Sequence, residues 1–254
     1  MMLPRTPSFR LDGKRAVVTG GSRGIGLGCA VALAEQGASV VIVARSKGQV
    51  FETVNEMKSE GFSVSGAPMD VSIIDNVKNL MGEYSDIDIL VNSAGIARHT
   101  PTVDTTELDF DDVMSVNVRS AYFLAQSAAK QMISKGTGGS IIQISSQMAH
   151  VGGIDRAVYC GTKHAIEGIN KSMAIEFGPY KIRVNSICPT FIRTPFTEPT
   201  FKDPEKVKWI ESKIKVGRVG EVEDIMGAVK FLASDVSAMV TGSSILIDGG
   251  WTAG

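Results

Sequence analysis

Short runs of apolar and β-branched residues recur along the chain and are separated by longer stretches of helical length. Parallel strands are buried on both faces, so they appear in a sequence as continuous apolar runs rather than as an alternating pattern. The runs that this pattern predicts as strands are residues 16–19, 39–43, 63–67, 87–91, 140–145, 183–187 and 244–247. Helices are predicted between them, including residues 25–36, 111–135, 158–177 and 222–233.

The alternation of strands and helices indicates the fold class. Consecutive β-α-β units join parallel strands through right-handed crossovers, which place helices on both faces of the sheet. We therefore expect an α/β protein with a Rossmann-type, doubly wound parallel sheet of about seven strands in three α/β/α layers. No internal repeat or low-complexity linker interrupts the pattern, so residues 1–254 are predicted to form a single domain.

One segment departs from this rhythm. Residues 189–216 are rich in Pro, Phe and Thr, and they follow a predicted strand. A long segment beyond the carboxyl end of a strand commonly covers a binding site. We expect residues 189–216 to be a substrate loop; the alternative is a surface excursion without a binding role.

Composition narrows the classes of function. The 254 residues are 43% hydrophobic and 21% charged, as in globular proteins. A net charge of −1, with scattered Lys and Arg, argues against a nucleic-acid partner and an anionic membrane surface. Cys29, Cys160 and Cys188 are far apart, so we expect neither a metal site nor a disulfide framework. The chain has no signal-like segment and no run of roughly 20 apolar residues, so a cytoplasmic location is expected.

The first predicted strand ends in a glycine-rich turn that leads directly into a helix. Glycines allow the backbone to turn sharply and approach a pyrophosphate, and a helix N-terminus favours the negative charge of that group. At the first strand–helix junction of a doubly wound sheet, such a turn predicts dinucleotide binding. The residues expected to contact the cofactor here are Gly20, Ser22, Arg23, Gly24, Ile25 and Gly26.

Tyr159 and Lys163 are spaced to share one face of a predicted helix. The pKa of a free tyrosine is near 10, and a nearby cation lowers it by stabilising the phenolate. Tyr159 can then protonate a carbonyl oxygen or accept the proton of an alcohol. Ser146 ends a predicted strand, and its hydroxyl can hold the substrate oxygen; Ser145 is the neighbouring alternative.

Taken together and in this order, the motifs resemble the short-chain dehydrogenase/reductase family. The resemblance covers nearly the whole chain and rests on the TGxxxGxG turn, on Asn-Ser-Ala-Gly at 92–95, and on Ser146 with Tyr-x-x-x-Lys. It implies catalytic roles for Ser146, Tyr159 and Lys163. It also implies that Asn117 holds a water and a helix main chain near the lysine. The ending Asp248-Gly249-Gly250 matches the family and implies a homo-oligomer, commonly a homotetramer.

The same resemblance implies further cofactor contacts at strand ends. Asp70 matches an adenine contact, although it can also begin the next helix. Ser93 stands where the family has a second Asn, and Thr190 replaces the glycine of the family's Pro-Gly, which puts the local turn in doubt. The contacts that the resemblance implies are Asp70, Val71, Asn92, Ala94, Gly95, Tyr159, Lys163, Pro189, Ile192 and Thr194.

The end of the second predicted strand indicates which nicotinamide cofactor is used. NAD-selective proteins of this fold carry an acidic residue there to bind the ribose hydroxyls. This chain has Arg45-Ser46 instead, and no acid appears before Glu52. The guanidinium groups of Arg45 and Arg23 suit a 2′-phosphate. We therefore predict NADP(H), with contacts from Arg45 and Ser46, and leave NAD(H) open.

The predicted activity is reversible, metal-independent hydride transfer between NADP(H) and a small carbonyl or secondary-alcohol substrate. The resemblance is to the 3-oxoacyl-carrier-protein reductase group, which implies a 3-oxoacyl thioester. Sugar, polyol and sugar-acid dehydrogenases share the same motifs and form the alternative. A non-enzymatic dinucleotide sensor is a further alternative, which the presence of both Tyr159 and Lys163 disfavours.

Several other side chains carry weaker hypotheses. An anionic substrate would suit a site at Arg156 or Lys202, while His99 and His150 divide evenly between substrate contact and loop structure. His164 is expected to face away from the cleft, and Cys160 is expected to serve helix packing. Two aromatic residues of the long segment either cover an apolar substrate or anchor the segment, namely Phe196 and Trp209.

Overall fold

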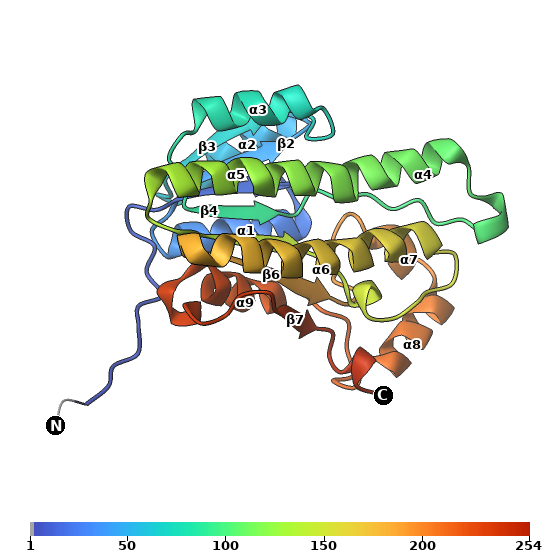
Figure 1. The fold of residues 1–254 in the computed structure, drawn as a ribbon. Helices are drawn as coiled ribbons and strands as arrows, with labels where there is room; N and C mark the ends of the chain where they lie inside the picture. The colour runs from blue at the N-terminus through green and yellow to red at the C-terminus, as the bar shows by residue number, and fades with distance from the viewer. Residues whose placement is uncertain (1–2) are drawn as a thin grey trace.

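The computed structural model describes residues 3–254, so the first two residues of the predicted domain 1–254 lie outside it. Within this range, seven strands form one sheet in the order β3-β2-β1-β4-β5-β6-β7 (Figure 1). Every neighbouring pair in this sheet is parallel, which confirms the predicted doubly wound sheet. The strands are β1 (Arg15–Thr19), β2 (Ser39–Ala44), β3 (Val64–Pro68), β4 (Ile89–Asn92), β5 (Gly139–Ile144), β6 (Ile182–Pro189) and β7 (Ser244–Ile247).

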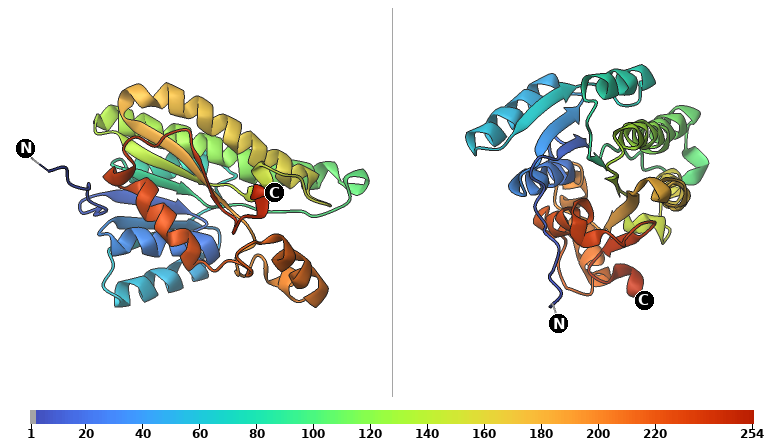
Figure 2. Two further views of the ribbon diagram at one scale, coloured as in Figure 1. Left: turned by 90° about the horizontal axis from the view of Figure 1, so that it is seen from below. Right: turned by 60° about the vertical axis from the view of Figure 1, so that its left-hand side comes forward.

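Helices cover both faces of the sheet, as Figure 2 shows in its right-hand view. On one face, apolar side chains of α1, α2 and α9 pack against the sheet; on the other, those of α3, α5 and α6 do so. No helix in residues 3–254 combines the length and apolar character that crossing a bilayer requires. The α-helices are α1 (Gly24–Glu35), α2 (Lys47–Ser59), α3 (Ile74–Glu83), α4 (Glu107–Met114), α5 (Ala121–Lys135), α6 (Ala157–Phe177), α7 (Glu198–Phe201), α8 (Pro204–Lys213) and α9 (Glu223–Ala233).

The predicted continuous helix 111–135 is wrong in its bounds and in its regularity. The helical stretch begins at Glu107, and the π-helix Ser115–Ser120 separates α4 from α5. In a π-helix the chain makes a wider turn, which re-aims the side chains within it and is frequent at functional sites. Asn117 lies within this wider turn.

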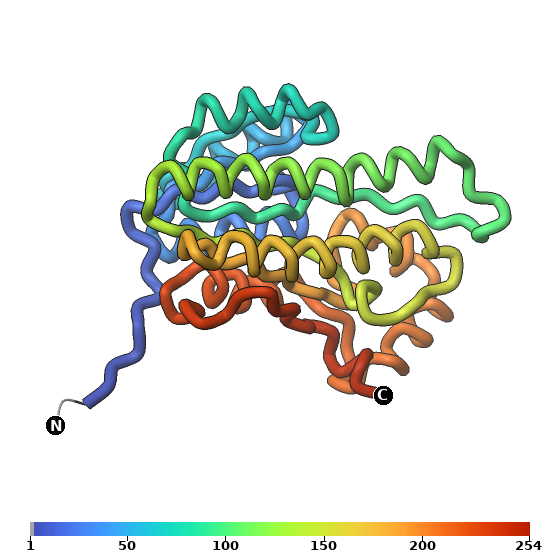
Figure 3. Tube along the Cα trace, in the orientation of Figure 1, coloured from blue at the N-terminus to red at the C-terminus, as the bar shows by residue number. Residues whose placement is uncertain are grey.

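Residues 189–216 leave the sheet after β6 and form α7 and α8 beyond the carboxyl ends of the strands, as the tube in Figure 3 traces. This segment has a small apolar core of its own, separate from the two faces of the sheet. Ile210 and Ile214 are buried there, and Trp251 from the chain's end packs against them. The segment is therefore anchored at one side of the sheet's carboxyl edge.

Candidate active site

A cavity of about 690 Å³ opens at the carboxyl edge of the sheet. It extends from the β1–α1 turn and the end of β2 to the end of β5, the start of α6 and the segment after β6. Ligands of doubly wound sheets bind at this edge, where the strand order reverses. The cavity is lined by all the sequence-predicted site residues except Asn92 and Asn117.

The β1–α1 turn is shaped for a close approach by a phosphate group. A Cβ at Gly26 would lie 2.1 Å from the Gly20 carbonyl oxygen, so only glycine fits this position. Gly20 has a φ of +66°, and a Cβ there would lie 2.9 Å from the Ala94 backbone nitrogen. Helix α1 has no side-chain cap and no acid in its first turn. Its first N–H groups are therefore available to an anion, as a dinucleotide requires.

Arg23 and Arg45 lie at the same end of the cavity. Both side chains are exposed, and both residues line the cavity together with Ser46. Neither guanidinium forms an ion pair with a carboxylate in the part of the chain that the structure describes. This pair of free cations fits the extra phosphate of NADP(H) better than the neutral ribose of NAD(H).

Asp70 lines the cavity, whereas Asn92 does not. The Asp70 carboxylate accepts hydrogen bonds from the Ser72 backbone N–H at 2.9 Å and the Ser72 hydroxyl at 2.7 Å, so it shapes the turn before α3 while also lining the cavity. Asn92 is buried outside the cavity lining and donates to the Ala121 carbonyl at 3.1 Å. Its side chain ties β4 to α5, while the residues that follow it, Ser93, Ala94 and Gly95, line the cavity.

Tyr159, Lys163 and Ser146 come together in the middle of the cavity. The spacing of Tyr159 and Lys163 places the Lys163 Nζ 5.6 Å from the centre of the Tyr159 ring. Lys163 is buried and donates to the Ile144 carbonyl at 2.9 Å. The Ser146 oxygen accepts from the Met148 N–H at 3.1 Å, which leaves its hydroxyl hydrogen available for another oxygen.

Burial dominates the acid–base properties of this group. It raises the pKa of the Tyr159 phenol, while the Ser146 hydroxyl and the Arg156 guanidinium act in the opposite direction. Burial also lowers the pKa of Lys163 to about 8, against the effect of Cys188 and Glu167. Lys163 is the predicted source of phenolate stabilisation; in the structure, the Arg156 guanidinium is a cation that acts to lower the Tyr159 pKa.

Asn117 occupies the π-helix and reaches two other segments. Its Oδ1 accepts from the Ile96 N–H at 2.9 Å, and its Nδ2 donates to the Ile96 carbonyl at 2.8 Å. The same Nδ2 lies 3.3 Å from the Thr162 Oγ1, in the turn of α6 that precedes Lys163. Asn117 thus joins the cavity wall at Ile96 to the helix that carries Tyr159 and Lys163.

The segment after β6 continues the sheet without strain. The Thr190 N–H donates to the Ile247 carbonyl at 3.1 Å. Thr190 does not have a positive φ, which among the described non-glycine residues only Asp155 and Lys181 have. Replacing the family's glycine by threonine therefore leaves the turn intact. Pro189, Ile192 and Thr194 all line the cavity.

Beside the catalytic group, the buried Gln147 and the half-buried Thr190 each have buried polar atoms without partners. Both the Oε1 and the Nε2 of Gln147 lack a hydrogen bond, and so does the Oγ1 of Thr190. Both residues line the cavity. Buried polar atoms are normally paired, so these positions call for partners that a ligand or ordered water supplies. The sequence pattern alone contained no signal for this.

The residues that carried weaker hypotheses differ in whether they line the cavity. Arg156, His99 and Phe196 line the cavity. Lys202 lies outside it, where it pairs with Glu198 at 3.3 Å on the surface of the α7 region. Trp209 packs edge-on against Trp251 with ring centres 5.5 Å apart, so it anchors the long segment. His164 is exposed and bonds through Nδ1 to the Cys160 carbonyl at 2.9 Å, which keeps it out of the cavity.

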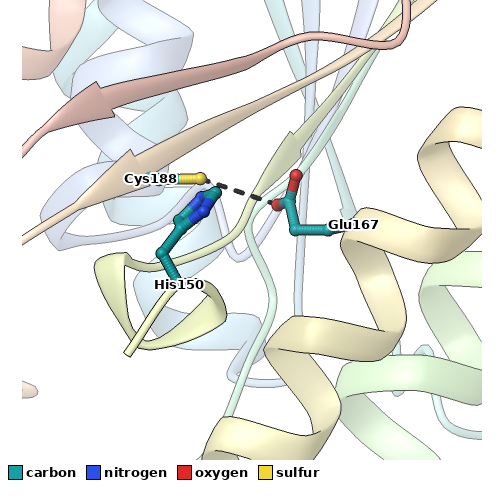
Figure 4. A group of neighbouring side chains, drawn as sticks. All are labelled: His150, Glu167 and Cys188. Atoms are coloured by element: carbon teal, nitrogen blue, oxygen red, sulfur yellow. Dashed lines mark hydrogen bonds between the residues drawn. The ribbon is translucent and has the colours of Figure 1, made fainter. Parts of the chain in front are cut away.

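Glu167, Cys188 and His150 form a cluster outside the cavity lining, with one potential metal-binding atom of each within 4.8 Å of the others (Figure 4). The Glu167 carboxylate is buried and accepts from the Ser186 hydroxyl at 2.8 Å, from the Ser244 hydroxyl and from the Cys188 thiol at 3.6 Å. Burial raises the pKa of Cys188 to about 12, so it stays a protonated donor. The carboxylate is thus already satisfied by protein hydrogen bonds.

Known proteins resemble this chain along almost its whole length. The sequence model of the family described as Enoyl-(Acyl carrier protein) reductase matches residues 20–252. The L-xylulose reductase of Bos taurus is 37% identical over 245 residues, which cover 96% of this chain and 99% of that protein.

Solved structures agree with it in fold. A gluconate 5-dehydrogenase from Burkholderia cenocepacia J2315 in complex with NADP and tartrate is 35% identical, with a TM-score of 0.93 over 97% of this chain and 98% of that one. A short-chain type dehydrogenase/reductase from Mycobacterium marinum is 37% identical, with a TM-score of 0.91 over 97% and 98%.

Proposed function

Because the chain belongs to the short-chain dehydrogenase/reductase family of NAD(P)-dependent oxidoreductases that act on CH–OH groups, we propose that it interconverts a secondary alcohol and a carbonyl. The reacting group belongs to a polyhydroxylated small molecule, and the cofactor is NADP(H). Substrates of this class are sugars, polyols and sugar acids. The names of the relatives support this alternative better than the 3-oxoacyl thioester of the sequence prediction.

The residues of the cavity divide into those that would hold the cofactor and those that act on the substrate. The β1–α1 turn would hold the pyrophosphate, and Arg23 and Arg45 the 2′-phosphate. Asp70 would hold the adenine, and Ile192 and Thr194 the carboxamide. When bound, the cofactor supplies or accepts the hydride.

We assign the proton transfer to Tyr159. As a general acid or base it gives its phenol proton to the carbonyl oxygen, or takes the alcohol proton in the reverse direction. The free hydroxyl hydrogen of Ser146 donates to the same oxygen and stabilises its developing charge. Lys163 contributes positive charge beside the phenol, and Asn117 positions the helix that carries both.

The observation that carries the substrate class is the buried Gln147 amide, which lines the cavity next to Ser146 and has no partner for either polar atom. Thr190, which follows the neighbouring strand β6, adds an unpartnered hydroxyl to the same cavity. Substrate hydroxyl groups can satisfy both, since each hydroxyl is a donor and an acceptor. An acyl chain would leave these atoms buried without partners, at a cost of about 1–3 kcal/mol each.

A substrate panel tests this proposal. Initial rates with NADPH or NADP⁺ would be measured for ketoses, polyols, sugar acids and 3-oxoacyl thioesters. The polyhydroxylated compounds should give the highest kcat/KM; a preference for acyl thioesters would overturn the proposal. Gln147→Leu should raise KM for the best polyhydroxylated substrate about tenfold and leave a simple ketone unaffected. Gln143→Leu is the matched control, because Gln143 is a buried amide outside the cavity lining.

The proposed enzyme is a homotetramer. Large apolar side chains are exposed on α4 and α6, including Leu108 at 72% and Ile175 at 79%. In the proposed tetramer, contacts between subunits would remove these side chains from water. Light scattering coupled to gel filtration measures the mass in solution; a monomer of 27.0 kDa would contradict this assignment.

A further inference from the structure

Arg156 is held over the cavity by the loop that precedes α6. It is the N-cap residue immediately before this helix, and its side chain makes no capping hydrogen bond. Asp155 immediately before it has a φ of +58°, a conformation that few non-glycine residues adopt and that is found at functional sites. A Cβ at Gly153 would lie 2.8 Å from the Arg156 Cδ, so the stem packs closely on the loop backbone.

The Arg156 guanidinium has no carboxylate partner in residues 3–254. Its Nη1 lies 2.8 Å from the His99 Nε2, and its Cζ lies 5.4 Å from the centre of the Phe191 ring. The residue is half-buried, and burial lowers its pKa. A guanidinium has five N–H donors, and a neutral ring and an aromatic face satisfy only part of them. The remaining donors are available to an anion within the cavity.

His99 does not neutralise this charge. Burial, together with Arg156 and Lys206, lowers the pKa of His99 to about 4, so the ring is neutral at ordinary pH and its Nε2 accepts from Arg156. Asp155 is the carboxylate whose charge acts on both residues, but it forms no ion pair with Arg156. The Arg156–His99 pair therefore carries a net positive charge.

This pair lies beside the reacting group. The His99 and Tyr159 rings meet edge to face with centres 6.0 Å apart, and the Arg156 charge lowers the pKa of the Tyr159 phenol. All three residues line the same cavity. An anionic group bound to Arg156 would thus be part of the same molecule whose carbonyl or hydroxyl group contacts Tyr159. That molecule would be a small acid.

We propose that Arg156, oriented by His99, binds the carboxylate of the substrate, so that the preferred substrates are polyhydroxylated keto acids and hydroxy acids. This inference rests on the proposed function and narrows its substrate class. A planar, two-pronged guanidinium matches a carboxylate in a way that a lysine does not. Arg156 and Lys202 are the two residues that the sequence suggested for an anionic substrate. Only Arg156 lines the cavity, because Lys202 is paired with Glu198 outside it.

A matched pair of substrates tests the inference: a keto-aldonate and its methyl ester, in which one methyl group replaces the negative charge of the carboxylate. Wild type should show a kcat/KM about 10- to 100-fold higher for the acid, as expected for charge-assisted hydrogen bonds. Arg156→Met should remove this preference by lowering kcat/KM at least tenfold more for the acid than for the ester, whose smaller loss reports the effect of Arg156 on the Tyr159 phenol. Arg156→Lys should restore part of the preference. Lys202→Met is the matched control and should change neither value.

Binding without turnover gives a second measurement. Malonate, a dicarboxylate without a reacting group, should inhibit wild type competitively against the acid and inhibit Arg156→Met at least tenfold more weakly. Equal losses for acid and ester in Arg156→Met, or an unchanged malonate inhibition constant, would overturn the inference. If wild type turns over neutral ketoses well without preferring acids, only the inference fails. If it turns over only acyl thioesters, the proposed function fails as well.

Discussion

The side chain of Asn117 holds both backbone polar groups of Ile96, accepting from its N–H at 2.9 Å and donating to its carbonyl at 2.8 Å. Ile96 lines the cavity, whereas Asn117 does not. Asn117 therefore acts on the site through another residue, by fixing the cavity wall against the π-helix. The third contact, with Thr162 at 3.3 Å, extends this link to the helix of Tyr159 and Lys163.

Removing this side chain should loosen the cavity wall. In Asn117→Ala, the Ile96 N–H and carbonyl lose their partners, so the amide of Ile96 should exchange with solvent at least tenfold faster and kcat should fall. Hydrogen exchange read by mass spectrometry or NMR measures the first effect. Asn185→Ala is the control: Asn185 also bonds two backbone groups, those of Val240 and Ser243, but outside the site. Equal exchange at Ile96 in both variants would contradict this role.

Tyr159→Phe should retain the cofactor and lose turnover. The ring that packs against His99 is kept, and only the phenol oxygen is removed. Loss of a general acid or base costs on the order of 10²- to 10⁴-fold in kcat. Nicotinamide fluorescence would measure NADPH binding, which should stay within about threefold of wild type by this reasoning. Turnover at the wild-type rate would refute the assignment of the proton transfer.

Arg45→Ala should weaken the preference for NADPH. An arginine–phosphate hydrogen bond contributes about 1.5–3 kcal/mol, so kcat/KM with NADPH should fall by about 10- to 100-fold. The value with NADH, which lacks the 2′-phosphate, should not change. Arg218→Ala serves as control, because Arg218 is paired with Asp224 outside the cavity. A parallel loss with both cofactors would argue against a phosphate contact.

The low pKa of Lys163 predicts how stability depends on pH. Its pKa is about 8 in the folded protein against an ordinary value of 10.5, so between these values the unfolded chain binds more protons than the folded one. Stability should therefore rise with pH across this window, by on the order of 3 kcal/mol, while below pH 8 the folded protein carries the full cost of a buried cation. The free energy of unfolding of Lys163→Met should therefore exceed that of wild type by more at pH 7 than at higher pH.

Denaturant unfolding of wild type and Lys163→Met at pH 7 and pH 10 measures this. The free-energy difference between the two proteins should shrink as the pH rises, since the other titrating groups are common to both. A difference that is independent of pH would show that burying the Lys163 ammonium does not reduce the stability of the folded protein.

Glu167→Ala should destabilise the fold. It would leave the Ser186 and Ser244 hydroxyls and the Cys188 thiol without their acceptor, at a cost of about 1–3 kcal/mol per buried group. The melting temperature should fall by several degrees. Glu176→Ala, an exposed acid on the same helix, should leave it within a degree or so. Equal melting temperatures for the two variants would contradict the role of Glu167.

Much of the fold could be predicted from the sequence because buried parallel strands carry a strong pattern. Runs such as 39–43 are apolar throughout, and the strand formed there is Ser39–Ala44. The interruption at Ser115–Ser120 was missed because a π-helix differs from an α-helix by a backbone turn that leaves no distinct periodicity. Helix α2 was given no bounds, although its buried Val50, Val54 and Met57 recur at helical spacing.

The site was predictable where function depends on residue type at a fixed spacing. Tyr159 and Lys163 lie together because positions four apart share a helix face. The roles of Ile96 and Gln147 depend instead on which atoms lack or find partners in three dimensions. Asn92 was predicted as a cofactor contact because its motif matches the family. In the structure its side chain bonds to the Ala121 carbonyl instead of lining the cavity.

The free guanidinium groups of the cavity also bear on how quickly molecules arrive there. Arg23 and Arg45 lie at one end and Arg156 at the other, in a chain whose net charge is only −1. A concave surface with an excess of one sign of charge concentrates field lines and draws oppositely charged solutes toward it. Dissolved ions weaken this attraction beyond about 8–10 Å. Added salt should therefore slow the capture of anionic solutes while the chemical step, once they are bound, proceeds at the same speed.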